Sequence, residues 1–469
     1  MKVNSNSVFD LLSGLRTYFQ GDSAVLKFDK EEPFLSELFS SSQLDEHAIA
    51  VAKSHKLTAR ESSDQLLKRL EDNEASLLEV RNILVESIRD GKDITPGAEW
   101  LLDNFYLIEE QVVLARKHLP KGYSEGLPYL TNGNSAGMPR IYDIVLEIIS
   151  HSDGRVDIKS LTSFIASYQT HTLLTLGELW AIPIMLRLAV LENLRRVGAI
   201  IALDMIDHNL ANYWAASMMT TVKDEPGDLI LTIADMARSK PILNSSFVAA
   251  CIRELQGKGP SLALPLSWME QQLSGMGLSS SDLVRQETQK QAADQVSVRN
   301  SIGTLRFIGA TDWRDFVEAL SSVEQVLRKD ITGVYPRMDF STRDRYRHVV
   351  ESISKDCTLS ETEVAQKVLE LTEKHGDPDP ISKRKEHVGY YLIDKGRKQA
   401  EKAARMRYSV KQKLICEAKK IPVFLYLFSI TFLTFTVAFA MWRLAYVHGE
   451  HSWISLTVVG LLSISGSAQ

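Results

Sequence analysis

Apolar residues recur at three- and four-residue spacing through most of this 469-residue chain, which predicts a mainly α-helical protein. Alternating apolar and polar runs are few, so we expect few strands. The expected helices cover 60–90, 95–120, 140–150, 158–169 and 181–197, followed by a helical block over 311–374.

The stretch 177–197, GELWAIPIMLRLAVLENLRRV, is nearly as apolar as a membrane span but carries charged residues near its centre. A central arginine such as Arg187 is costly in contact with lipid, and neighbouring leucines do not easily compensate. Pro183 suits the first turn of a helix that begins near Ala181. We therefore predict a buried helix of a water-soluble domain, with a membrane helix as the alternative.

A second apolar stretch, IPVFLYLFSITFLTFTVAFAM at 421–441, has no charged residue and is long enough to cross a bilayer. Lysines precede it and Trp442 follows, as expected at membrane interfaces. A shorter apolar stretch at 453–466 predicts a partial second membrane segment. The expected fold is thus mainly α, a helical cytoplasmic region followed by one complete transmembrane helix and a partial second one.

The residues before the predicted span are strongly basic. Between 381 and 420 there are 13 Lys or Arg against 4 Asp or Glu. Basic flanks favour the cytoplasmic side of a membrane, so residues 1–420 are expected to be cytoplasmic and the basic flank to contact anionic lipids.

Changes in composition divide the chain into six regions. The expected boundaries are an N-terminal helical region at 1–130, a helical domain at 131–254, a flexible segment at 255–300, a helical region with a basic end at 301–420, the transmembrane helix at 421–442 and the partial segment at 453–466.

Composition and charge exclude several classes of protein. The formal net charge of −5 gives no indication of nucleic-acid binding. Cys251, Cys357 and Cys416 are far apart, which favours neither a zinc motif nor a disulfide framework. The first residues lack the apolar run and cleavage site of a secretory signal.

The sequence GNSAG at 133–137 matches the nucleophile-elbow pattern of hydrolases, with Ser135 at its centre. That motif needs a strand before the serine and a helix directly after it. Here the serine lies in a stretch rich in Gly, Pro, Asn and Ser, so we interpret it as a loop. A hydrolase that uses Ser135 remains a disfavoured alternative.

Two other loops weakly resemble ligand motifs. Asp153 and Asp157 flank a glycine in SDGRVD, but alternate carboxylates and a closing glutamate of a calcium loop are missing. A helix–helix turn, with Asp157 as the cap of the next helix, fits better. Lys258 in QGKGPS lacks the first glycine and following Ser or Thr of a phosphate loop.

Two further groups of residues could form a site. Glu109, Glu110 and His118 offer acid–base or metal-binding groups, but adjacent glutamates point to different helix faces, so solvated charges are expected. Trp313 and Arg314 could stack on a sugar, although a core tryptophan near a helix start is the preferred interpretation. We expect no catalytic, cofactor-binding or metal-binding residue in this chain.

Several long motifs, in order along 60–420, together resemble one family, the cyclic β-1,2-glucan synthases. They are AEWLLDNFYLIEEQ (98–111), KHLPKGYS (117–124), LTLGELWAIPIMLRLAVLENLRR (174–196), SVRNSIGTLRFIGATDWRDFVEALSSVEQVLRKD (297–330), YPRMDFSTRDRYRHVVE (335–351) and HVGYYLIDKGR (387–397).

The resemblance implies a very large inner-membrane enzyme that polymerises glucose from UDP-glucose through β-1,2 linkages and closes the chain into a ring. The matching motifs belong to the part before the transferase module. Such a transferase needs aspartates for the sugar nucleotide and a divalent metal, and a Gln-x-x-Arg-Trp signature. The signature is absent here, and Asp377-Pro378-Asp379 lies in a loop broken by proline.

The sequence therefore predicts the amino-terminal, non-catalytic part of such a synthase, as a truncated product, fragment or split gene, inactive alone. UDP-glucose and the metal would bind the full-length enzyme and not this chain. Its partners would be membrane lipids and the transferase portion or other membrane proteins. The alternative is a stand-alone membrane-anchored helical adaptor that binds other proteins.

Overall fold

The computed structural model describes residues 37–58, 65–120, 122–239, 241–373, 384–406 and 422–447. The chain divides into two compact units, Met1–Glu324 and Gln325–Gln469. Within the described residues helices dominate and the only sheet has two short strands, which confirms the predicted mainly α fold.

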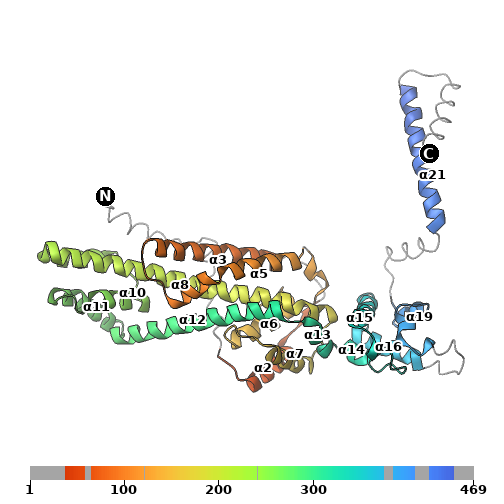
Figure 1. Ribbon diagram of the computed structural model, residues 1–469, viewed down its shortest axis with the longest axis horizontal. Coiled ribbons are helices and arrows are strands. Elements are labelled where there is room, and N and C mark those ends of the chain that lie inside the picture. Colours follow the sequence, from red (N-terminus) through yellow and green to blue (C-terminus); the bar gives the residue numbers. More distant parts are fainter. Residues whose placement is uncertain are drawn as a thin grey trace. The chain divides into compact units, whose positions relative to one another are not determined.

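The first unit is a bundle of helices arranged along one long central helix (Figure 1). Its elements are α2 (Ser41–Ser54), β1 (Leu57–Thr58), α3 (Gln65–Arg89), α4 (Pro96–Asp103), α5 (Phe105–His118), η1 (Tyr123–Gly126), β2 (Tyr129–Leu130), α6 (Arg140–His151), α7 (Ile158–Gln169), α8 (Leu176–Asp224), η2 (Pro226–Asp228), α9 (Leu229–Arg238), α10 (Ser245–Leu255), η3 (Pro260–Leu262), α11 (Ala263–Gly275), α12 (Ser280–Ala310) and α13 (Trp313–Leu320), with α14 (Ser322–Leu327) at the boundary between the units.

Helix α8 has 49 residues and contributes to both hydrophobic cores of this unit. Its first part, up to Ile206, packs in a large core with α3, α5, α6, α7 and α12. Its last part, from Leu210 onward, packs with α9, α10 and α11 in a second core. The predicted buried helix at 181–197 is therefore confirmed as part of a longer helix.

The start of α8 differs from the prediction. Thr175 is the N-cap and forms a capping box with Glu178, so the helix begins at Leu176 and not near Ala181. Pro183 consequently lies inside the helix, where it removes one backbone hydrogen bond. The capping box and deep burial on both sides of the proline account for its tolerance here.

Residues 95–120 were expected to form one helix, but the helix is interrupted at Asn104, which separates α4 from α5. The Thr95 side chain caps α4, as predicted. The Asn104 side chain donates to the Trp100 carbonyl and accepts from Arg306 of α12 at 2.6 Å. A distant residue thus fixes the break, which local pattern alone could not show.

The segment 255–300, expected to be flexible, is mostly helical. It contains η3, α11 and most of α12, a helix of 31 residues. Most residues of the polar run QETQKQAADQ favour helices, and buried side chains such as Leu283 and Glu287 hold α12 against α10.

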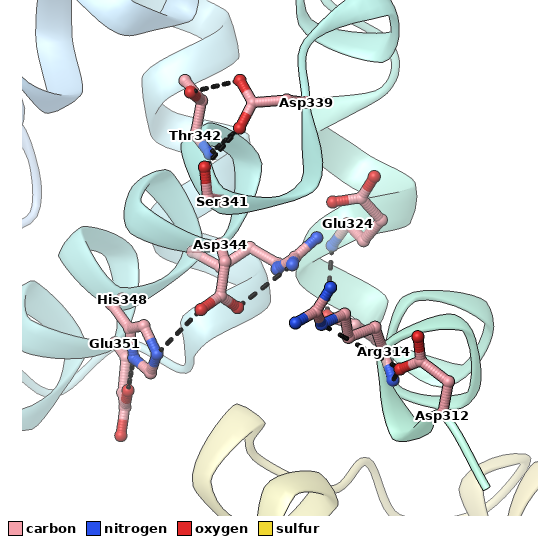
Figure 2. A network of polar contacts seen from close by, with 11 residues as sticks. Asp312, Arg314, Glu324, Asp339, Ser341, Thr342, Asp344, His348 and Glu351 are labelled. Carbon is pink, nitrogen blue, oxygen red and sulfur yellow. Dashed lines mark hydrogen bonds and ion pairs between the residues drawn. The ribbon is translucent and has the colours of Figure 1, made fainter.

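The second unit is also helical. Its elements are η4 (Tyr335–Arg337), α15 (Phe340–Lys355), α16 (Glu361–Glu373), α18 (Val388–Leu392), α19 (Arg397–Ala403) and α21 (Pro422–Val447). The Asp339 side chain caps α15 through the Thr342 amide, as Figure 2 shows. These helices confirm the predicted helical block that ends near residue 374.

The expected transmembrane segment at 421–442 forms α21, a helix of 26 residues with exposed apolar side chains such as Phe432 and Leu433. Across the described part of the chain, no helix meets the length and hydropathy that a membrane crossing requires. The transmembrane assignment is therefore not confirmed. The expected segment at 453–466 and the basic end at 407–420 lie outside the described residues.

Candidate functional site

Buried charges gather where α8 faces α6 and α3. Arg140, at the start of α6, donates two hydrogen bonds to the carboxylate of Glu178, at 2.5 and 2.7 Å. Both side chains are buried. Burial alone would lower the pKa of Arg140, but the bonded carboxylate outweighs it and raises that pKa. Because Arg140 also donates to the Leu173 carbonyl, the pair joins α6 to the turn before α8.

About four turns further along α8, the Glu192 carboxylate accepts hydrogen bonds from three side chains. Arg69 of α3 donates two hydrogen bonds to its carboxylate, and Tyr142 of α6 and Arg196 of α8 donate one each. Burial opposes ionisation of Glu192, but these donors, Arg69 above all, lower its pKa to about 2. Glu192 is therefore ionised at neutral pH and cross-links three helices.

A cavity of about 420 Å³ opens beside this cluster, between α3, α6 and the loop before α6. Its volume is in the range of small-molecule pockets. Polar groups of three elements reach it. They are Arg69, Asn134, Ser135, Tyr142, Asp143, Glu147 and Ser150.

His47 of α2 forms a cluster with Glu147 and His151 of α6. The His47 Nε2 atom is 2.7 Å from the Glu147 Oε2 atom, and the His151 Nε2 atom is 3.5 Å from it. Potential ligand atoms of the three residues lie within 4.8 Å of one another. Two imidazoles and a carboxylate form a ligand set that proteins use for zinc.

These three residues were not among the sites predicted from the sequence. Glu147 and His151 are four residues apart on a helix, so the sequence alone could have indicated that they share one helix face. His47 is about a hundred residues earlier and reaches them only because α2 packs against α6.

Ser135 lies in the cavity wall, but its surroundings differ from a nucleophile elbow. Four residues lie between the end of β2 at Leu130 and Ser135, and four more lie between Ser135 and the start of α6 at Arg140. Gly133 and Gly137 on either side have positive φ, as turns require. In the described part of the chain no side-chain hydrogen bond reaches the Ser135 hydroxyl, which agrees with the loop interpretation.

The two aspartates of SDGRVD have structural roles. The Asp157 carboxylate accepts from the amides of Lys159 and Ser160 and caps α7, as predicted. Asp153 accepts from Asn300 of α12, and burial raises its pKa. Between them Gly154 adopts a φ of +72°, and a Cβ there would lie 2.6 Å from the Ser301 hydroxyl.

The remaining candidates lie apart from one another. Glu109 pairs with Arg81 at 3.3 Å on the surface. The Trp313 indole donates to a backbone carbonyl and packs on Phe307 and Phe316, so the core interpretation holds.

The other candidate residues are exposed or lie outside the described residues. Glu110, His118 and Arg314 are exposed, and Lys258 pairs with Glu254. Asp377 and Asp379 lie outside the described residues.

The second unit has its own polar network on α15. Figure 2 shows His348 between the carboxylates of Asp344 and Glu351, at 3.4 and 2.8 Å. The hydrogen bond with Glu351 raises the pKa of His348. A cavity of about 460 Å³ in this unit is lined by Tyr346 and His387 among other residues. Burial lowers the pKa of that histidine.

The sequence is similar to that of the cyclic beta-(1,2)-glucan synthase NdvB of Rhizobium meliloti, with 27% identity over 358 residues. The aligned region covers 76% of this chain and 12% of that relative. No protein-family model matches the chain.

The fold and the buried ion pairs define a helical scaffold in which charged side chains hold helices together. The match to this cyclic β-(1,2)-glucan synthase confirms the resemblance seen in the motifs of the chain. The chain spans about an eighth of the length of this relative.

Proposed function

We propose that this chain is the helical, non-catalytic part of a membrane-bound cyclic β-1,2-glucan synthase that precedes the transferase module. Its role is to support and position that module. The sequence match over 76% of the chain carries the proposal. The transfer of glucose from UDP-glucose would belong to the transferase portion, together with the divalent metal that this chemistry requires.

The charged groups of the first unit support a structural role. Glu178 and Glu192 are fully buried and are saturated by arginine and tyrosine donors. A general acid or base must instead reach a substrate. The sequence also lacks the Gln-x-x-Arg-Trp signature expected of the transferase.

Membrane anchoring by α21 is the second part of the proposal. Its 26 residues would extend about 39 Å, at about 1.5 Å per residue, and no charged residue occurs before Arg443. Exposed apolar side chains such as Phe428, Phe432 and Leu433 are expensive to leave in water and suit lipid. The basic residues at 381–420 favour a cytoplasmic position for the helical units.

Two assays of the full chain test this function. The chain, purified in detergent, is incubated with radiolabelled UDP-glucose and Mg²⁺ or Mn²⁺, with membranes holding an intact synthase as the positive control. We expect no labelled glucan from the chain alone. Formation of β-1,2-glucan would contradict the non-catalytic role.

The second assay tests for a partner. The chain is co-expressed with a synthase that lacks the matching region, and the two are co-purified. We expect the transferase portion to copurify with the wild-type chain and to be recovered in smaller amounts with the destabilised Glu192→Ala variant. Recovery of a stable, membrane-bound chain without the transferase would favour the adaptor instead.

A further inference from the structure

In the cluster of His47, Glu147 and His151, two hydrogen-bond acceptors face each other. The His151 Nδ1 atom lies 2.9 Å from the backbone carbonyl of Glu37. A carbonyl only accepts, so Nδ1 must carry the proton of this hydrogen bond. In the neutral ring, Nε2 then presents a lone pair to a Glu147 carboxylate oxygen 3.5 Å away. Two acceptors that face each other need a cation between them.

The surroundings of the cluster hold its groups in place. The Phe39 ring stacks on His151, with ring centroids 3.9 Å apart, and the Phe39 amide donates to the His151 carbonyl. A histidine that donates its second nitrogen to a backbone carbonyl is the usual arrangement around a protein-bound metal. Glu147 and His151 share one face of α6, and His47 approaches from α2.

We propose that His47, Glu147 and His151 form a binding site for a divalent transition metal of the zinc class. The ligands would be the Nε2 atoms of both histidines and a carboxylate oxygen of Glu147. Tetrahedral ligands about 2.0–2.2 Å from zinc are roughly 3.3 Å apart, so the atoms, all within 4.8 Å of one another, need only small movements.

The fourth coordination position would be open to water. The side chains of His47 and Glu147 are 25% and 33% exposed, so the metal has an entry path from solvent. Bound metal would fasten α2 and the residues around Phe39 to α6. Since the unfolded chain lacks the assembled site, metal binding would also stabilise the folded first unit.

The test uses the full chain in detergent, with a purification tag free of histidine, after removal of metal with a chelator. Zn²⁺ is titrated by calorimetry, and Co²⁺ binding is followed by its visible d–d absorption. We expect one equivalent of each ion to bind, Co²⁺ to show the intense bands of low coordination number, and Zn²⁺ to raise the melting temperature.

Glu147→Gln and His47→Ala should each weaken Zn²⁺ binding at least about tenfold and remove the Co²⁺ bands. His118→Ala, which removes an exposed histidine on α5, is the matched control and should bind like the wild type. Circular dichroism of each metal-free variant shows whether the fold is retained. If a variant unfolds, the other one decides the result.

Two results would overturn the site. The first is a folded wild-type chain that binds no Zn²⁺ or Co²⁺, which would leave a proton as the cation between the histidine and the carboxylate. The second is equal binding by the wild type and the two folded ligand variants. Neither result bears on glucan synthesis, so the metal site and the proposed function can fail separately.

Discussion

Helices α8 and α21 are both long and apolar, but their charged and apolar residues are placed in opposite ways. In α8, charged residues such as Glu178 and Glu192 are fully buried among partners from α3 and α6. In α21, charged residues are absent before Arg443, and apolar residues such as Phe432 are exposed.

This difference shows what a charge within an apolar helix means. A buried charge persists in a protein core when other side chains satisfy it, and it then specifies which helices pack together. An apolar helix whose side chains are exposed needs a different environment, for which we propose the bilayer. Apolar content alone would have grouped the two helices together.

Removal of the Glu192 carboxylate should have the largest effect on the α8 side of this comparison. Glu192→Ala leaves Arg69 and Arg196 without their buried counterion, so we expect a loss of about 3–5 kcal/mol of unfolding free energy. Denaturant titration followed by circular dichroism measures it. Glu109→Ala removes an exposed partner of Arg81 and should cost less than about 1 kcal/mol. Equal losses of unfolding free energy in the two variants would show that the buried Glu192 cluster stabilises the fold no more than an exposed ion pair.

A charged residue introduced into α21 tests whether this helix anchors the chain in a membrane. Leu433→Arg should disfavour membrane insertion by about 2.5–3.5 kcal/mol, so the chain should shift from the carbonate-resistant membrane fraction to the supernatant or to aggregates. Leu231→Arg, at an exposed leucine of α9, is the matched control and should leave the membrane fraction unchanged. Unchanged retention of Leu433→Arg would argue against α21 as the anchor.

A smaller effect on the free energy of unfolding is expected from ionisation of Asp294 in α12. Burial, then the nearby acids Asp204, Glu287 and Asp153 against the opposing Lys290, raise its pKa from 3.8 to about 7. Since this pKa is raised on folding, the stability that protonated Asp294 provides is present below about pH 4 and lost as pH rises through 7.

Asp294→Asn should therefore stabilise the chain by roughly 1–2 kcal/mol at pH 8 and have little effect at pH 4. Thermal unfolding at both pH values measures the difference, and Asp235→Asn at an exposed surface pair is the control. A stabilisation that is the same at both pH values would show that ionisation of Asp294 is not its cause.

Local signals in the sequence predicted local structure well. Thr95 and Asp157 were identified as caps, and α6 and α7 were predicted close to their observed bounds, because capping depends on residues within one turn. The interpretation of Trp313 as a core residue also holds, since its apolar neighbours are adjacent in sequence.

Features that depend on distant residues were missed. Asn104 interrupts the helix through its contact with Arg306, and α12 is ordered by packing against α10. The candidate metal cluster needs His47, which only the tertiary fold brings to Glu147. Likewise, Arg187 was recognised as unsuited to lipid, but its partner Gln111 could not be found from spacing.

The most direct test of the central claim separates the two helices in the membrane-bound protein. A specific protease site is placed within 407–421, and membranes that hold the full chain are cleaved and washed at high salt. If α8 belongs to a water-soluble body and α21 is the anchor, the fragment ending before α21 appears folded in the supernatant while α21 stays in the pellet. Retention of the cleaved helical body in the membrane, or release of the uncleaved chain without detergent, would contradict the account.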